Sequence, residues 1–148
     1  MTVICWDGKT LAADKRQSHG GLHATTMKLH KLPDGRLVAG CGTAPMIGEM
    51  LYWLAAGCDP SNFPALQRDA KECASMLVVT RGKPLQQYEN TPYPCVILNK
   101  QWSIGSGRDF ALMAMHLGKT AAEAVELASI FCTSCGNGVD TMTLEEPQ

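Results

Sequence analysis

The chain has 148 residues, of which 45% are hydrophobic, and its formal net charge is −1. This length and apolar content predict one globular domain over residues 2–148 and exclude a disordered chain, while the near-neutral charge excludes the basic surface that a nucleic-acid partner requires. The first residues lack the basic start and apolar run of a signal peptide, and no segment reaches membrane-spanning length, so we expect a cytoplasmic protein with no membrane partner.

The first part of the chain alternates β-branched or apolar segments with turn residues. The strands expected here are Thr2–Trp6, Thr10–Asp14, Thr25–Leu32 and Arg36–Cys41. Asp7-Gly8-Lys9 and Pro33-Asp34-Gly35 are typical turn sequences between such strands. Residues 16–24 are polar and rich in glycine, so we expect a loop there.

The middle of the chain changes from strand to helix patterning. Apolar residues from Met46 onward predict a helix that ends near Gly57. Residues 58–73 are ambiguous, with one short helix expected over Ala65–Glu72. The strands expected after it are Met76–Thr80, Leu85–Tyr88, Cys95–Leu98 and Trp102–Ile104.

Two helices and one strand are expected in the last part of the chain. The first helix runs over Arg108–Leu117, and the second runs from the N-cap Thr120 to Phe131, with Glu123 placed for a capping box. After a loop at 133–138, Val139–Leu144 is expected to form the final strand. Runs of strands separated by paired helices predict a layered α+β domain.

Four local segments carry a resemblance to a known family. They are Thr2 opening a strand directly after Met1, the segment 8–14 (GKTLAAD), the segment 27–40 (MKLHKLPDGRLVAG) and the segment 104–107 (IGSG) before an Ala/Met-rich helix. In this order they resemble the proteasome β-subunit family, and most closely the bacterial HslV-type peptidases. The resemblance implies a four-layer α-β-β-α sandwich of the N-terminal nucleophile hydrolase type.

Two features depart from that family pattern. The stretch between the first helix and the strand at Met76 is short, which implies a shortened helical layer. The family also carries an Asp and a Ser in the segment that corresponds to 132–138, where this chain has no Asp and only Ser134 or Cys135 could substitute.

The resemblance implies a threonine peptidase whose nucleophile, Thr2, is exposed when Met1 is removed. An α-amino group has a pKa of about 7.7–8.0 and can act as the base for the neighbouring hydroxyl. Asp14 is expected to keep Lys28 charged, Lys28 to lower the pKa values of the Thr2 hydroxyl and amine from an adjacent strand, and Ser106 to hydrogen-bond the amine or a relaying water.

The remaining expectations concern the oxyanion, the substrate and the partners. The backbone N–H of Gly42 is the expected oxyanion donor, with Gly40 as the alternative. The implied substrate is an unfolded polypeptide bound as an extended strand. HslV-like peptidases act as closed homo-oligomeric rings fed by an ATPase unfoldase, so the resemblance implies both partners and no cofactor.

Other interpretations stay open at the level of sequence. Taken singly, Thr2 is a residue that permits Met removal, Asp14 a turn-capping carboxylate and Lys28 an exposed strand lysine. The main alternative function is a catalytically inactive homologue that serves as an assembly or scaffold subunit, for example of a phage. A retained Met1 would favour it, because the Thr2 amine would then be locked in a peptide bond. An amidase with other substrates is a third possibility.

The seven cysteines are scattered and odd in number, so we expect reduced, mostly buried thiols. Cys132 and Cys135 have the spacing of a redox pair or half a zinc site, but no second cysteine pair accompanies them. His19 and His23 lie in the polar segment without further ligand candidates. We therefore expect no metal site.

Overall fold

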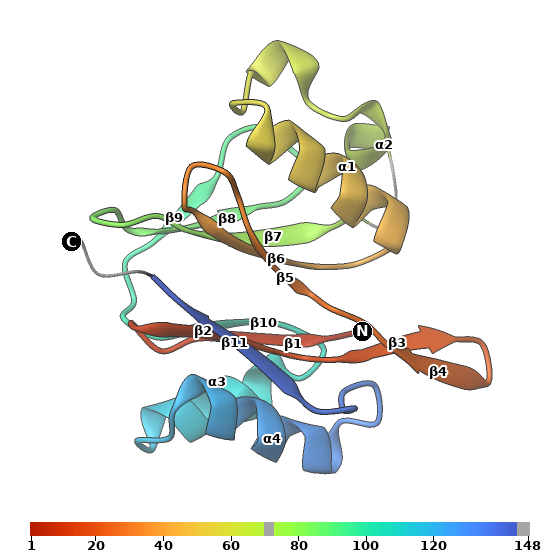
Figure 1. Ribbon diagram of the computed structural model, residues 1–148, viewed down its shortest axis with the longest axis vertical. Helices are drawn as coiled ribbons and strands as arrows, with labels where there is room; N and C mark the ends of the chain where they lie inside the picture. The colour runs from red at the N-terminus through yellow and green to blue at the C-terminus, as the bar shows by residue number, and fades with distance from the viewer. Residues whose placement is uncertain (70–72, 145–148) are drawn as a thin grey trace.

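The computed structural model describes residues 1–69 and 73–144, and it has the mixed α+β composition expected from the sequence. Figure 1 shows two sheets stacked face to face, with α1 and α2 covering the outer face of one sheet and α3 and α4 covering the outer face of the other. The elements therefore lie in layers, and the start of the chain lies in one of the two inner sheets.

The sheet that contains the start of the chain has four antiparallel strands in the order β10-β1-β2-β11. They are β1 (Val3–Trp6), β2 (Thr10–Asp14), β10 (Trp102–Gly105) and β11 (Val139–Thr143). The turn between β1 and β2 is closed by Asp7, whose carboxylate accepts hydrogen bonds from the backbone N–H groups of Lys9 and Thr10 at 2.9 and 2.8 Å. This confirms the predicted turn.

The second sheet has five strands in the order β5-β6-β7-β8-β9. They are β5 (Leu29–Lys31), β6 (Leu37–Cys41), β7 (Ser75–Val79), β8 (Leu85–Tyr88) and β9 (Cys95–Ile97). Side chains alternate between the two faces of a strand, so Val38 and Val78 pack toward α1 while Leu37 and Leu77 pack against the other sheet.

The helices are α1 (Ala44–Ala55), α2 (Ala65–Asp69), α3 (Arg108–His116) and α4 (Ala121–Phe131), with a 3-10 turn at Pro60–Asn62. The predicted capping box is confirmed: Glu123 N–H donates to Thr120 Oγ1 at 3.2 Å, and Thr120 N–H donates to the Glu123 carboxylate at 3.3 Å. The helix expected over 65–72 is present as the short α2, while residues 70–72 lie outside the described part of the chain.

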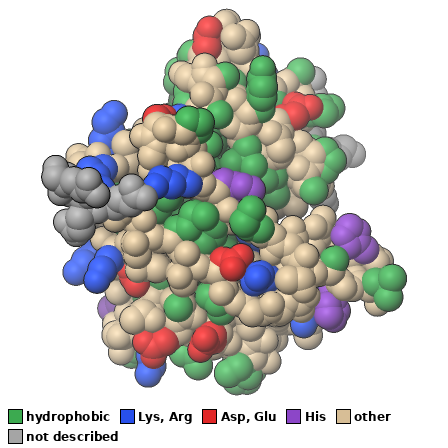
Figure 2. Space-filling view, in the orientation of Figure 1, with side chains coloured by type: hydrophobic (Ala, Val, Ile, Leu, Met, Phe, Trp, Pro, Cys, Tyr) green, Lys and Arg blue, Asp and Glu red, His purple; other side chains and the backbone are tan. Residues whose placement is uncertain are grey.

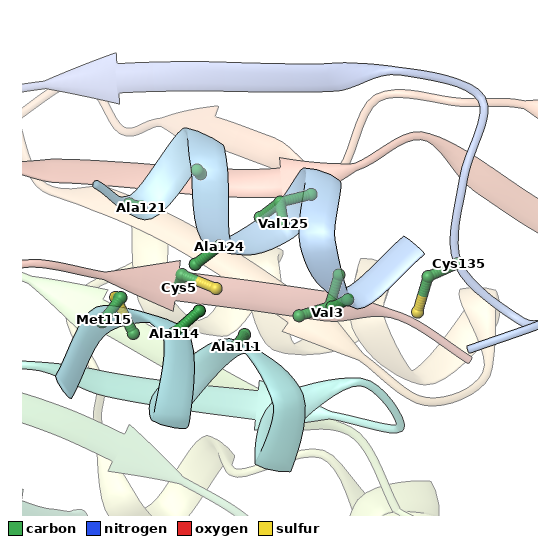
Figure 3. Packing of buried hydrophobic residues seen from close by; sticks show 11 residues of the cluster. Val3, Cys5, Ala111, Ala114, Met115, Ala121, Ala124, Val125 and Cys135 are labelled. Atoms are coloured by element: carbon green, nitrogen blue, oxygen red, sulfur yellow. The ribbon is translucent and has the colours of Figure 1, made fainter. Parts of the chain in front are cut away.

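Apolar side chains fill the space between neighbouring layers in three clusters. Val3 and Cys5 of β1 belong to the cluster under α3 and α4, which Figure 3 shows from close by. Ile4, between them in the chain, faces the opposite way, into the space between the sheets. Strand β1 is thus buried on both faces, which holds the residue that precedes it firmly in place.

The loop expected at 16–24 is wrong. The segment forms a two-stranded hairpin of β3 (Arg16–His19) and β4 (Leu22–Thr25), joined at Gly20-Gly21. Gly-Gly is a favoured two-residue hairpin turn, but these strands bury no apolar face and so show no hydrophobic alternation. The strand expected over 25–32 is accordingly divided, because β4 ends at Thr25 and β5 begins only at Leu29.

Candidate active site

Thr2 lies immediately before β1 and only 4% of its surface is exposed. Its backbone N–H donates to Ser106 Oγ at 3.1 Å, and its carbonyl oxygen accepts from the N–H of Gly107 and from Ser106 Oγ, both at 3.2 Å. These contacts anchor the backbone of Thr2 on the segment between β10 and α3. The hydroxyl is left to point toward the second sheet.

Lys28, the residue just before β5, contacts the Thr2 hydroxyl. Its Nζ donates to Thr2 Oγ1 at 3.0 Å, to Asp14 Oδ1 at 2.8 Å and to the carbonyl oxygen of Met1 at 3.3 Å. These contacts engage all three protons of the ammonium group. The expectation that Lys28 comes from a strand adjacent to Thr2 is wrong: β5 belongs to the five-stranded sheet, so Lys28 reaches across the interface between the two sheets.

Asp14 ends β2 and is completely buried. Besides Lys28, its carboxylate accepts hydrogen bonds from the backbone N–H groups of Val3 at 3.1 Å, Arg16 at 3.1 Å and Gly136 at 3.0 Å. A buried carboxylate is costly unless it is paired and hydrogen-bonded. Here one cation and three N–H groups supply that compensation, and they fix Asp14 and Lys28 relative to the start of β1.

The backbone before Ser106 requires a glycine at position 105. Its φ is +97°, and a Cβ at this position would overlap the carbonyl oxygen of Thr2. Only glycine combines this backbone conformation with so close an approach. This close approach of the two backbones brings the Ser106 hydroxyl to the nitrogen of Thr2. The structure therefore brings together the four residues predicted from distant parts of the sequence, which are Thr2, Asp14, Lys28 and Ser106.

A pocket of about 490 Å³ opens beside Thr2 and Lys28, and both Gly40 and Gly42 line it. Gly40 lies within β6, where it pairs with Met76, whereas Gly42 follows the end of the strand. The φ of Gly42 is +130°, and a Cβ there would lie 2.9 Å from the Cα of Ala74, so glycine is required. Gly42 thus lies beyond the paired residues of β6, whereas Gly40 lies among them.

The pocket has a mostly apolar wall with ionisable groups at intervals. Met27, Ile47 and Leu51 supply apolar surface, and His30 lies half-buried between the strand and the helix layer. Burial lowers the pKa of His30, so its imidazole is neutral at neutral pH. Figure 2 shows acidic and basic side chains interspersed on one face of the molecule, with histidine side chains both on the projecting β3–β4 hairpin and near the middle of the view.

The loop expected at 133–138 is present, but sequence reasoning missed its contacts with the β3–β4 hairpin and with Asp14. Asn137 has a φ of +64° and holds the hairpin to this loop: its side chain accepts from Arg16 Nε at 3.1 Å and donates to the Ala24 carbonyl at 3.2 Å. The preceding Gly136 donates its N–H to Asp14. The Gly-Asn-Gly sequence is a turn signal that could have indicated an ordered turn here, but its partner was in the segment taken for a loop.

The two residues considered as substitutes for the missing Asp also lie at the site. Ser134 Oγ donates to the sulfur of Met1 at 3.2 Å, and Cys135 Sγ lies 3.8 Å from Ser106 Oγ.

Within residues 1–69 and 73–144, His, Cys, Asp and Glu side chains form no group of three or more that could hold a metal ion. In the described parts of the chain, no helix combines the length and apolar character needed to cross a membrane.

Comparison with known proteins identifies the fold. No family model matches the sequence, and no curated protein matches it. Among solved structures, eukaryotic HslV from Trypanosoma brucei has a TM-score of 0.67 at 17% identity, covering 98% of this chain and 99% of the other. Thiobacillus denitrificans BPH in complex with epoxomicin has a TM-score of 0.74 at 18% identity, covering 99% and 100%. A second structure of Thiobacillus denitrificans BPH has a TM-score of 0.70 at 18% identity, covering 99% of this chain and 100% of the other. The resemblance to HslV is thus confirmed at the level of the fold.

Proposed function

We propose that the protein is a threonine-type peptidase of the N-terminal nucleophile hydrolase type, in which Thr2 attacks peptide bonds after removal of Met1. One observation carries the proposal: the Thr2 hydroxyl is hydrogen-bonded to an ammonium group that is itself ion-paired with a completely buried carboxylate. A surface threonine at the second position of a chain requires no such arrangement.

The chemistry follows from the freed amine. The nitrogen of Thr2, now in a peptide bond with Met1, becomes an α-amine that accepts the proton of Oγ1, directly or through a water held by Ser106. Oγ1 then attacks the substrate carbonyl carbon. The tetrahedral intermediate collapses with expulsion of the amine product, which takes the proton back, and leaves an ester on Thr2. Water, deprotonated by the same amine, hydrolyses this ester.

Lys28 and Asp14 supply the electrostatics. The positive charge 3.0 Å from Thr2 Oγ1 favours the alkoxide that develops as the proton leaves. Asp14 holds that charge in position at 2.8 Å and offsets the cost of burying it. The N–H of Gly42, at the rim of the pocket, stabilises the oxyanion, and the apolar wall receives a substrate side chain.

The substrate we propose is an unfolded polypeptide, bound as an extended strand. We also propose that the protein acts in the cytoplasm as a homo-oligomeric ring, to which an ATPase unfoldase delivers the substrate. An exposed apolar face on α3 and α4 supports assembly with further copies. Its large exposed side chains are Phe110, Met113, Leu117, Ile130 and Phe131. Contiguous apolar surface of this kind marks an interaction site. Mass measurement of the native assembly tests this part.

The experiment that tests the catalytic proposal combines N-terminal sequencing, intact mass and labelling with epoxomicin. We expect a chain that begins at Thr2 and takes up one label, and we expect Thr2→Ala to abolish both labelling and peptide hydrolysis. Thr26→Ala, in the wall of the same pocket, is the matched control and should still be labelled.

The opposite result supports a different function. A folded chain that keeps Met1 and takes up no label would overturn the peptidase proposal and favour the inactive assembly or scaffold subunit. A chain that begins at Thr2 and is labelled, but hydrolyses small amides and no peptides, would favour an amidase.

A further inference from the structure

Cys132 and Cys135 lie beside the site and are not used by the proposed mechanism. Their sulfur atoms are 3.3 Å apart, and the N–H of Cys135 donates to the carbonyl oxygen of Cys132 at 3.1 Å. This backbone hydrogen bond defines a β-turn, whose first and last Cα atoms lie within about 7 Å. Disulfides span Cα separations of about 4.4–6.8 Å. The two thiols can therefore be joined with little movement of the backbone.

The two thiols differ in exposure and in acidity. Cys132 is half-buried at the end of α4, whereas Cys135 is only 1% exposed and lies at the edge of the apolar cluster, near Val3 (Figure 3). Burial alone raises the pKa of Cys132, but hydrogen bonds with Cys135, Ser106 and nearby N–H groups outweigh it, and the pKa is lowered. Burial, with contributions from Cys132 and Asp14, raises the pKa of Cys135 to about 12.

We propose that Cys132 and Cys135 form a redox-active pair, which closes to an intramolecular disulfide on reaction with a low-molecular-weight disulfide of the glutathione class. The Cys132 thiolate attacks one sulfur of the oxidant, breaks its S–S bond and releases one thiolate, leaving a mixed disulfide on Cys132. Cys135 loses its proton to water and attacks Cys132 Sγ, which releases the second thiolate. The pair loses two electrons and two protons, and the oxidant becomes two thiols.

The disulfide changes the surroundings of Ser106. In the reduced structure, Cys135 Sγ donates to Cys132 Sγ, and Cys132 Sγ donates to Ser106 Oγ at 3.7 Å. Ser106 Oγ in turn accepts from the nitrogen of Thr2. Oxidation removes both S–H donors and draws the sulfurs together to about 2.05 Å. This consequence rests on the proposed function of Thr2, whereas formation of the disulfide does not. Cytosolic disulfides, when present, are usually transient and catalytic or redox-sensing.

The test treats the reduced full-length protein with oxidised glutathione and measures its mass without reducing agent. We expect loss of two hydrogen atoms and a peptide map that joins Cys132 to Cys135. In Cys135→Ser, and in Cys135→Ala if the serine variant does not fold, the first step should be trapped, with one glutathione retained on Cys132. Cys132→Ser should form neither product at this pair. Cys95→Ser, which removes an exposed thiol, is the matched control and should form the disulfide as the wild type does.

A wild-type protein that retains glutathione on Cys132, or that shows no change at the pair, would overturn the proposal. Epoxomicin labelling of Thr2 gives the second measurement. We expect labelling to slow about fivefold in the oxidised protein, which corresponds to one net hydrogen bond. Equal rates in both redox forms would overturn the link to Thr2 and leave the disulfide intact. A disulfide in a protein that epoxomicin never labels would mean that the peptidase proposal, rather than the redox pair, has failed.

Discussion

Thr2 is flanked by two groups that differ in burial and in the bonds that hold them. On one side Lys28 and Asp14 are 9% and 0% exposed and are joined by a 2.8 Å ion pair with three further backbone donors to the carboxylate. On the other side the exposed Ser106 contacts two sulfur atoms at 3.7 and 3.8 Å.

Because of this difference, we expect substitutions in the two groups to affect folding and activity differently. Breaking a buried ion pair leaves an uncompensated charge, so a change at Lys28 or Asp14 affects folding and activity together. Weak hydrogen bonds at an exposed hydroxyl contribute little to folding, so Ser106 can be changed with an effect on activity alone. The variants below test this separation.

Replacement of the buried cation should have the largest effect. Lys28→Met leaves Asp14 charged and unpaired, so we expect a loss of about 3–5 kcal/mol in the free energy of unfolding and at least about a 100-fold loss of peptide hydrolysis. Urea unfolding followed by tryptophan fluorescence and epoxomicin labelling measure the two effects.

Lys15→Met is the matched control for that variant. It breaks the half-exposed pair of Lys15 with Asp140, which are 3.5 Å apart, and should cost less than about 1 kcal/mol. Equal stability of the Lys28→Met and Lys15→Met variants would contradict the structural role assigned to the buried pair.

Replacement of Gly105, which precedes Ser106, should reduce stability nearly as much. Gly105→Ala places a Cβ against the Thr2 carbonyl at a φ of +97°, and we expect a loss of about 3 kcal/mol or more. Gly20→Ala, at a φ of +61° with nothing within 4 Å of the added Cβ, should cost only about 1–2 kcal/mol. Thermal unfolding of both variants checks the difference, and equal losses would mean that backbone conformation alone, without the close approach, decides the cost.

Ser106→Ala should separate activity from folding. We expect peptide hydrolysis to fall about 100-fold, the lower end of the effect of one positioned proton-transfer group, with less than about 1 kcal/mol lost in stability. Ser129→Ala removes a hydroxyl that donates to the Val125 carbonyl at 2.8 Å within α4 and should leave hydrolysis unchanged. Unaltered hydrolysis in Ser106→Ala would remove this serine from the mechanism.

The smallest effect concerns His30 and pH. Because burial lowers its pKa in the folded state, the unfolded chain binds the proton first as pH falls. The stability contributed by His30 is therefore complete above the ordinary pKa of 6.5 and is lost as pH falls below it, by at most about 1.4 kcal/mol per pH unit. His30→Gln should flatten this dependence between neutral and mildly acid pH, whereas His19→Gln, on the exposed hairpin, should leave it unchanged.

Strands buried on both faces were predictable because they carry unbroken apolar sequence. Val3–Trp6 and Leu37–Cys41 are of this kind, and both were found within a residue of their expected bounds. The N-terminus of α4 was equally predictable, since a capping box needs only residues three apart in the chain. The β3–β4 hairpin was missed because its strands are stabilised by their mutual pairing and by Asn137, which no local pattern reports.

The residues of the candidate site divide in the same way. By itself the sequence determined the mixed α+β class, the order of the elements other than β3 and β4, and the identity of Thr2, Asp14, Lys28 and Ser106 as candidates, because these depend on local patterning and on motifs in a resembling chain. Only the tertiary structure decided that Lys28 reaches Thr2 from the opposite sheet, that Gly136 completes the partners of Asp14, and that two thiols lie against Ser106. These contacts join residues far apart in the chain, and their distances are set by how the two sheets and α4 pack.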